Sequence, residues 1–169
     1  MANTLQVAKS GESDLVMARN FDAPRALVFD AFTKPDLVKR WLLGPPGWSM
    51  PVCEIDLKVG GRYRYVWRNN ERGKDMGVAG SFREIAPPER LVHDELFDED
   101  WTGGQTVVTT LFSEENGKTT VTMTVRYASA VARDQALGTG MTKGVEQSYD
   151  RLADLLASEA SQHSEKSAA

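Results

Sequence analysis

The sequence contains few of the residues that build disulfides, metal sites or membrane spans. Its single cysteine, Cys53, cannot form a disulfide within the chain and favours a reducing compartment. With only two histidines, His93 and His163, it has no set of ligands at zinc-binding spacing. It also lacks a run of about 18 apolar residues and a recognisable secretion signal. We therefore expect a cytoplasmic protein with no membrane span, no metal and no cofactor.

Positive charge is also scarce. The chain has 20 lysines and arginines against 24 aspartates and glutamates, a net charge of −4. Nonspecific nucleic-acid binding requires a clustered basic surface, so we expect no nucleic-acid partner. The sequence also has no Gly-x-Ser-x-Gly elbow, and no Gly-Lys-Ser/Thr follows its glycine turns. These absences argue against a serine hydrolase and against a phosphate-binding loop.

What is present is typical of one globular domain. The chain has 169 residues and is 41% hydrophobic, enough for a core that needs no covalent support. Residues 1–13 are polar and weakly patterned, which predicts a flexible N-terminal lead. Residues 158–169 are small and polar, which predicts a flexible C-terminal tail. The domain is then expected over residues 14–157.

Hydrophobic periodicity divides the domain into strands and helices. A strand over residues 14–21 precedes two short helices, and a period of two then marks a run of antiparallel strands beginning at residue 52. Further strands are expected near residues 62–68, 76–85, 91–97, 106–113 and 119–127. Gly60 with Gly61, and Asn116 with Gly117, provide hairpin turns. From residue 130 apolar residues recur at helical spacing, predicting one helix of roughly 25 residues.

Only this last helix is long enough to cover the apolar face of the sheet. The predicted fold class is therefore α+β. We expect a curved antiparallel sheet of about six to seven strands wrapped around a long C-terminal helix, with two short helices after the first strand.

Several motifs occur in a specific order along the chain. They are residues 21–24 (Phe-Asp-Ala-Pro) with 28–32 (Val-Phe-Asp-Ala-Phe), 35–41 (Pro-Asp-Leu-Val-Lys-Arg-Trp), 56–63 (Asp-Leu-Lys-Val-Gly-Gly-Arg-Tyr), 80–85 with 88–92, and 140–152. In this order the chain resembles the Aha-type branch of the SRPBCC (START-like, helix-grip) superfamily, which is named after activators of a heat-shock chaperone ATPase. The resemblance implies a helix-grip fold with a space between sheet and helix. It also makes a chaperone a candidate partner and a stress response a candidate context.

The chain departs from this family in two respects. Many relatives carry tryptophan or methionine where this chain has Val145, and the smaller side chain should enlarge the space under the helix. The additional N-terminal domain of the eukaryotic chaperone activators has no counterpart in these residues. The second departure weakens a direct transfer of the chaperone role.

Eleven residues are candidates for binding a ligand in that space. An aromatic stripe alternates along one predicted strand, tryptophans in or beside loops are candidates for the mouth, and two residues come from the C-terminal helix. The stripe could equally be sheet core. The full set is Trp41, Trp48, Tyr63, Tyr65, Trp67, His93, Glu95, Phe97, Trp101, Met141 and Val145.

The orientation of His93 and Glu95 is left open by the sequence. Alternation places both on one face of a strand with Leu91 and Phe97, whereas the other face also carries two apolar residues, Val92 and Leu96. If they point inward, burial requires a partner or a ligand. Candidate partners are Arg64, Arg83 and Arg126. His93 and Glu95 would then also be the candidate catalytic acid and base.

Three functions fit these observations. The first is a binding protein for a hydrophobic or aromatic small molecule, and we favour it because it requires only a cavity. The second is a chaperone regulator that acts through protein contacts. The third is a polyketide cyclase-like or hydrolase-like enzyme that uses His93 and Glu95. The protein is expected to be a monomer or, through an exposed sheet edge, a homodimer.

Overall fold

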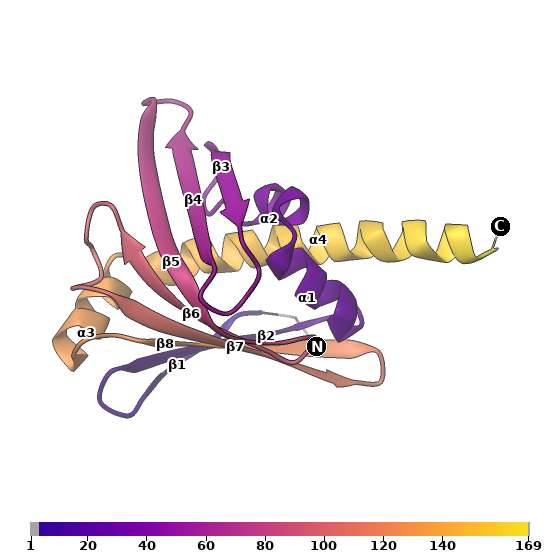
Figure 1. Ribbon diagram of the computed structural model, residues 1–169, viewed down its shortest axis with the longest axis horizontal. Helices are drawn as coiled ribbons and strands as arrows, with labels where there is room; N and C mark the ends of the chain where they lie inside the picture. Colours follow the sequence, from indigo (N-terminus) through magenta and orange to yellow (C-terminus); the bar gives the residue numbers. More distant parts are fainter. Residues whose placement is uncertain (1–3, 169) are drawn as a thin grey trace.

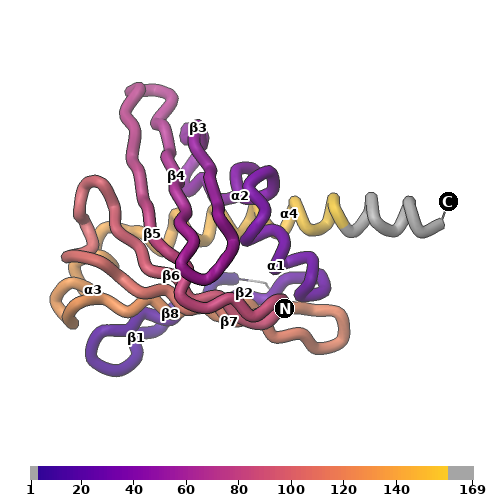
Figure 2. Tube along the Cα trace, in the orientation of Figure 1, coloured from indigo at the N-terminus to yellow at the C-terminus, as the bar shows by residue number. Residues whose placement is uncertain are grey.

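The computed structural model describes residues 4–168, and the side chains of residues 4–159. Within that range the chain forms eight strands and four helices (Figures 1 and 2). The strands are β1 (Gln6–Ser10), β2 (Asp14–Phe21), β3 (Trp48–Ile55), β4 (Arg62–Asn69), β5 (Lys74–Ala86), β6 (Arg90–Phe97), β7 (Thr106–Glu115) and β8 (Lys118–Arg126). The helices are α1 (Arg25–Thr33), α2 (Pro35–Trp41), α3 (Ala130–Gly138) and α4 (Met141–Ala168).

All strands belong to one antiparallel sheet in the order β1-β2-β8-β7-β6-β5-β4-β3. The sheet is strongly curved, so that β3, β4 and β5 rise from the plane of β1, β2, β7 and β8 (Figure 1). Helix α4 crosses the concave side, with α1 and α2 beside it. The α+β helix-grip prediction is therefore confirmed.

The sheet has one strand more than the upper end of the predicted range. Strand β1 lies in residues 1–13, which we predicted to be a loose lead, and pairs with β2 from Gln6 opposite Ala18 to Ser10 opposite Asp14. All five of its residues are exposed. Because neither face is buried, the strand has no hydrophobic alternation that the sequence could reveal.

The main core forms where α4 meets the sheet. Tyr149, Leu152 and Leu156 of α4 are at most 2% exposed. They pack in one cluster with Phe21 of β2 and Phe112 of β7, as well as with residues of α1 and α2. Burial of such side chains stabilises the fold by about 1.5–3 kcal/mol each. This cluster fixes the middle of α4 on the sheet and leaves its first turns over the site described below.

The turn between β3 and β4 contains Gly60 and Gly61, as predicted, but it begins earlier in the chain than we expected. We expected a strand that begins at residue 52 and continues up to the turn at Gly60, but β3 runs from Trp48 to Ile55. The chain then turns back, with the Gly61 nitrogen bonded to the Lys58 carbonyl and Gly60 at φ +82°. A Cβ at Gly61 would lie 2.1 Å from the Asp56 carbonyl oxygen, so only glycine fits there. Val59, expected in the strand, is 68% exposed.

The predicted single C-terminal helix is two helices. Gly140 adopts φ +82°, a left-handed conformation that ends α3 and separates it from α4. Helix α4 then extends to Ala168, past the residue where we placed the start of a tail. The side chains of residues 160–168, and residue 169 altogether, lie outside the described residues.

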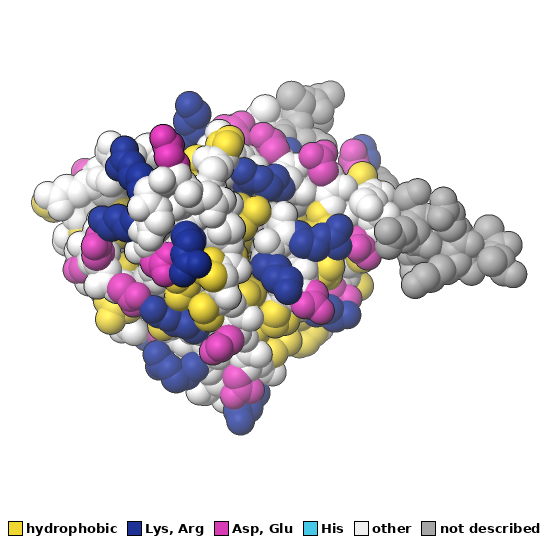
Figure 3. Space-filling view, turned by 90° about the horizontal axis from the view of Figure 1, so that it is seen from above, with side chains coloured by type: hydrophobic (Ala, Val, Ile, Leu, Met, Phe, Trp, Pro, Cys, Tyr) yellow, Lys and Arg dark blue, Asp and Glu magenta, His cyan; other side chains and the backbone are white. Residues whose placement is uncertain are grey.

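The outer surface mixes charges of both signs. In Figure 3, which looks down on the molecule from the top of Figure 1, basic and acidic side chains alternate with hydrophobic ones between them. The residues coloured on that face form no continuous basic patch. In the described part of the chain, no helix has the length and apolar character needed to cross a membrane.

Candidate functional site

A cavity of about 350 Å³ lies between the curved sheet and the N-terminal half of α4. All eleven residues proposed from the sequence line it, and so do others that the sequence analysis missed. The missed residues include Met17, Met76, Thr106, Met123 and Ser148. Met123 shares a strand face with apolar residues, and this alternation was the only signal that could have found it.

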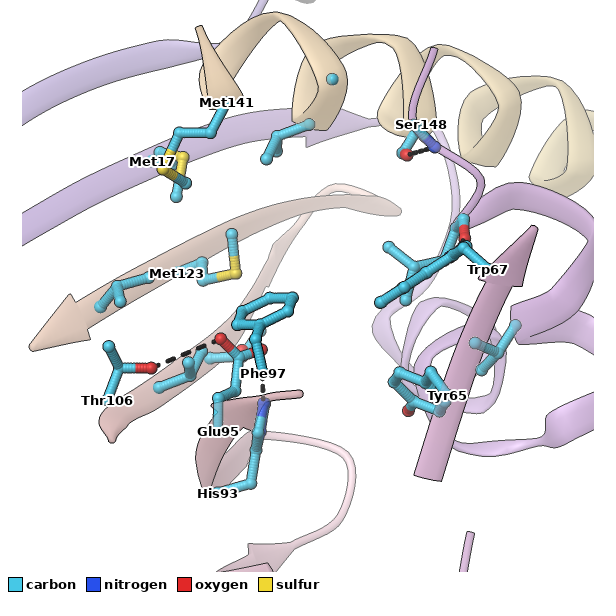
Figure 4. Close-up of a pocket in the computed structure, with 18 of the residues that line it drawn as sticks. Met17, Tyr65, Trp67, His93, Glu95, Phe97, Thr106, Met123, Met141 and Ser148 are labelled. Carbon is cyan, nitrogen blue, oxygen red and sulfur yellow. Dashed lines mark hydrogen bonds and ion pairs between the residues drawn. The ribbon is translucent and has the colours of Figure 1, made fainter. Parts of the chain in front are cut away.

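Strand β6 supplies the polar side of the cavity. Leu91, His93, Glu95 and Phe97 all line it, which places the pair on the inward face that the sequence left undecided. In Figure 4, His93, Glu95 and Phe97 project from this strand toward the cavity. The opposite face of β6 points away: Leu96 is 49% exposed, and Asp94 binds Arg83. Phe82 of β5 packs against His93 from the side.

Strand β4 forms the aromatic wall across from β6 (Figure 4). Tyr63 is 3% exposed and donates a hydrogen bond of 2.7 Å to the carbonyl of Asp94, so its hydroxyl is committed to the fold. The rings of Tyr65 and Trp67 lie 6.0 Å apart edge to face. Tyr65 and Trp67 therefore present the ring surface of this wall.

The three candidate mouth tryptophans have different positions. Trp41 is 2% exposed and donates from its indole nitrogen to the Ala31 carbonyl, so it is a core residue that touches the cavity rather than a rim residue. Trp48 opens β3 instead of lying in a loop. Trp101, in the loop after β6, packs against Phe97 with the ring centroids 4.9 Å apart.

The wall formed by β2, β8 and the start of α4 is apolar and consists largely of flexible methionine side chains. Met17 of β2 lies opposite Met123 of β8 in the sheet register, and Met141 and Val145 of α4 face them. Figure 4 shows Met17, Met123 and Met141 gathered on one side of the cavity. Methionine side chains adapt to irregular partners because they are unbranched and polarisable. Such a wall can adjust to an apolar molecule.

A loop of residues 42–47 closes the cavity between α2 and β3. Its Gly44 nitrogen donates to Ser148 Oγ at 2.8 Å, and Arg151 donates to the Gly44 carbonyl at 2.6 Å. On the other side, Trp67 Nε1 donates to the Leu42 carbonyl at 2.7 Å. Gly144 of α4 also lines the cavity beside the strap, and a Cβ on it would make an ordinary contact with Pro45 at 3.6 Å. We call residues 42–47 the strap.

Glu95 and His93 are the ionisable groups of the cavity apart from tyrosines. His93 Nε2 lies 3.7 Å from Glu95 Oε2, and Thr106 Oγ1 lies 3.4 Å from Glu95 Oε1. The arginines we proposed as partners are engaged elsewhere. Arg64 binds Asp98, Arg83 binds Asp94 and Arg126 binds Asp14, because all three side chains lie on the outer face of the sheet.

Burial raises the pKa of all four tyrosines, and all four line the cavity. For Tyr127 the pKa rises to about 12, from burial first and then from the negative charge of Glu95. Burial raises the pKa of Tyr63 and Tyr65 further, and Glu95 again contributes. Every phenol in the cavity is therefore neutral at physiological pH.

Two buried polar atoms beside the cavity form no hydrogen bond with the described residues. They are the indole nitrogen of Trp101 and the hydroxyl of Tyr149. Both atoms are inaccessible to solvent, so leaving them without a hydrogen bond lowers the stability of the fold. A ligand could reach them only if the surrounding side chains moved.

The described side chains include neither an activated cysteine nucleophile nor a group of metal ligands. Cys53 lies half-buried on β3 outside the cavity, and burial raises the pKa of its thiol to about 11. The thiolate is the nucleophilic form, so this cysteine is unreactive at neutral pH. In the part of the chain with described side chains, no three His, Cys, Asp or Glu residues are arranged to hold a metal ion.

Comparisons with known proteins agree on one family. The family model described as "Activator of Hsp90 ATPase homolog 1-like protein" matches residues 22–157. A crystal structure from Rhodobacter sphaeroides is 35% identical, with 92% of this chain and 99% of that chain covered and a TM-score of 0.86. An AHSA1 protein from Silicibacter pomeroyi is 24% identical over 87% of this chain and 99% of its own, with a TM-score of 0.69, and supports the fold. A search of curated proteins found no significant match.

Proposed function

This chain belongs to the family of Activator of Hsp90 ATPase homolog 1-like proteins, and on that premise we propose that it binds a hydrophobic or aromatic small molecule in the cavity under α4. The observation that carries the proposal is the cavity itself. Its volume of about 350 Å³ falls within the range of small-molecule sites, roughly 300–1,000 Å³.

The composition of the walls supports an apolar ligand. Aromatic rings from β4 and methionines from β2, β8 and α4 line the cavity, while His93 and Glu95, its described ionisable groups other than tyrosines, lie on β6. Binding sites for small molecules combine such apolar surface with a few polar groups that orient the ligand. The strap has hydrogen bonds on both of its sides, which makes the cavity preformed rather than dependent on closure.

Native mass spectrometry of the freshly purified protein, followed by solvent extraction, tests this proposal. We expect an adduct of small-molecule mass on the natural chain. Val145→Trp adds an indole to the cavity wall and should remove the adduct, while the gentler Val145→Met should reduce it. Val131→Trp is the matched control, because Val131 is 65% exposed and lies outside the cavity.

The results separate the proposal from its failure. Loss of the adduct in Val145→Trp but not in Val131→Trp, with both variants folded by circular dichroism, supports a ligand in the cavity. An adduct of equal amount in both variants contradicts the proposal, since the ligand would then be bound elsewhere.

A second candidate function is catalysis on the bound molecule. It is favoured by the single observation that His93 and Glu95 face the same cavity with 3.7 Å between their side chains. Such a pair can serve as general base and acid for a ligand held beside it. His93→Ala would then abolish conversion of the extracted ligand while leaving its binding in place. Unchanged turnover in that variant would eliminate His93 from the chemistry.

The regulator role suggested by the family's description remains an alternative proposal for this chain. It depends on surface contacts with a chaperone rather than on the cavity. Val145→Trp therefore distinguishes the two, because filling the cavity would leave a surface-mediated interaction intact.

A further inference from the structure

We infer that the ligand of the cavity is an amine, an apolar or aromatic body whose protonated nitrogen binds the carboxylate of Glu95. This inference rests on the proposed function and specifies the chemical class of its ligand. It follows from how Glu95 is placed and from what surrounds it.

Glu95 has unused capacity to accept hydrogen bonds. The Thr106 hydroxyl donates to it at 3.4 Å, longer than the 2.5–3.0 Å of a good oxygen–oxygen hydrogen bond. His93 Nε2 lies 3.7 Å away, beyond the 2.7–3.2 Å of a nitrogen–oxygen hydrogen bond. An ionised carboxylate offers about four lone-pair sites. The Glu95 side chain is only 26% exposed, so bulk water cannot fully replace the missing donors.

Neighbouring carboxylates on the other side of the sheet are fully matched. Asp94, the residue before Glu95, accepts from the Ser81 nitrogen at 2.9 Å and from Arg83 at 3.1 Å. Asp98 receives two hydrogen bonds from Arg64, of 2.7 and 2.6 Å. Among the described side chains, no lysine or arginine forms an ion pair with Glu95. His93, 3.7 Å away, is the one basic side chain beside Glu95 among the described residues, so a bound ammonium group would supply a close cationic donor that the fold does not provide.

The electrostatic character of the whole cavity favours a cation. Among the residues with described side chains, no lysine or arginine lines it, and its phenols are neutral, so Glu95 and His93 are the groups of this lining that can carry charge. Aromatic rings from β4 and β6 flank the carboxylate side: Tyr65 and Trp67 face Phe97 across the cavity (Figure 4). Their faces are electron-rich and attract ammonium groups.

The same arrangement disfavours an acid. A fatty or aromatic carboxylate placed here would bring a second negative charge to Glu95, and in the described lining His93 is the one basic side chain that could receive it. A neutral alcohol would bind, but without the added strength of a charge-assisted hydrogen bond. The expected order of affinity for one apolar body is therefore amine, then alcohol, then acid.

Three matched probes test this order by isothermal titration calorimetry at neutral pH. They are naphthylmethylamine, naphthylmethanol and naphthylacetic acid, which share a ring system and differ in the polar group. We expect the amine to bind about tenfold or more tighter than the alcohol, the scale of one hydrogen bond to a charged group. The acid should bind weakest.

Glu95→Gln removes the charge with little change in shape and should bring amine and alcohol to similar affinity. Glu84→Gln is the matched control, because Glu84 is exposed, pairs with Arg90 and lies outside the cavity. It changes the net charge of the protein by the same amount. The preference for the amine should persist in this control.

The outcomes distinguish this inference from the proposed function. If the alcohol or the acid binds as tightly as the amine, or if Glu95→Gln keeps the preference, the amine assignment is wrong while the cavity remains a binding site. If no probe binds the natural chain at all, the proposed function fails and the amine assignment with it.

Discussion

The indole nitrogen of Trp67 donates a hydrogen bond of 2.7 Å to the carbonyl oxygen of Leu42. The bond joins β4 to the first residue of the strap, whose Gly44 is held from the other side by Ser148 and Arg151 of α4. The strap thus connects the aromatic wall with the helix. The shape of the cavity depends on these contacts as much as on the sheet.

Replacing Trp67 by phenylalanine should lower the free energy of unfolding by about 1–3 kcal/mol, because it leaves the half-buried Leu42 carbonyl without its donor. Urea denaturation measures this change. Trp48→Phe is the control, since the Trp48 indole donates no hydrogen bond to a described residue although its ring also lines the cavity. Equal losses in the two variants would show that the hydrogen bond contributes nothing beyond the ring.

Ser148→Ala should loosen the strap on its helix side. The Ser148 hydroxyl is buried and accepts the Gly44 amide, so its removal leaves that amide without a partner. Hydrogen exchange followed by mass spectrometry should find faster exchange in a peptide covering residues 42–47, with β7 unchanged. An unaltered rate for this peptide would mean that Arg151 alone is enough to hold the strap on its helix side.

Asp150→Asn should destabilise the attachment of α4 to the sheet. Arg19 is 7% exposed on the inner face of β2, and its charge is paired with Asp150 at 2.7 Å. Because Asp150 itself is 63% exposed, we expect a loss of about 1–2 kcal/mol rather than the cost of a fully buried pair. Thermal unfolding tests this, with Asp154→Asn as an exposed control on the next turn. A comparable shift in both variants would contradict a specific role for the ion pair.

The tyrosines should resist ionisation in the folded protein. Burial raises their pKa values, to about 12 for Tyr127, above the usual 10.0. Burial of the neutral phenols therefore contributes to the free energy of unfolding. This contribution is fully present below pH 10 and is lost as the pH rises through the pKa of the folded state. Absorbance of tyrosinate should stay low near pH 10 in the native protein and appear at that pH in urea. Native titration of several tyrosines near pH 10 would indicate a cavity open to water.

All eleven candidate residues line one cavity, and their role in binding stays a prediction. Alternation along the strands placed Tyr63, Tyr65 and Trp67 together on one face. It could not decide which face of β6 points inward, because Leu91 and Phe97 on one face balance Val92 and Leu96 on the other. The deciding factor is tertiary. Arg83 and the Ser81 amide bind Asp94 on the outer side, and no local pattern in the sequence reports this contact.

The incorrectly predicted elements share a physical cause. Strand β1 buries nothing, so its pairing with β2 leaves no periodic signal. Leu57 and Val59 extend the alternation of β3 but lie in a turn whose path is set by backbone hydrogen bonds and by Gly61. The break at Gly140 interrupts a helical pattern that continues on both sides of it. The hydrophobic pattern of a sequence indicates which side chains are buried. These three features depend instead on backbone hydrogen bonds and backbone dihedral angles, which that pattern does not reveal.

The location of bound ligand is tested most directly by nuclear magnetic resonance of protein labelled with ¹³C in the methionine methyl groups. Met17, Met76, Met123 and Met141 line the cavity, while Met50 lies on β3 outside it and serves as an internal control. On titration with naphthylmethylamine, we expect the signals of Met17, Met123 and Met141 to shift while that of Met50 stays in place. A shift of Met50 with unmoved cavity signals would place the ligand on the surface and contradict the central claim.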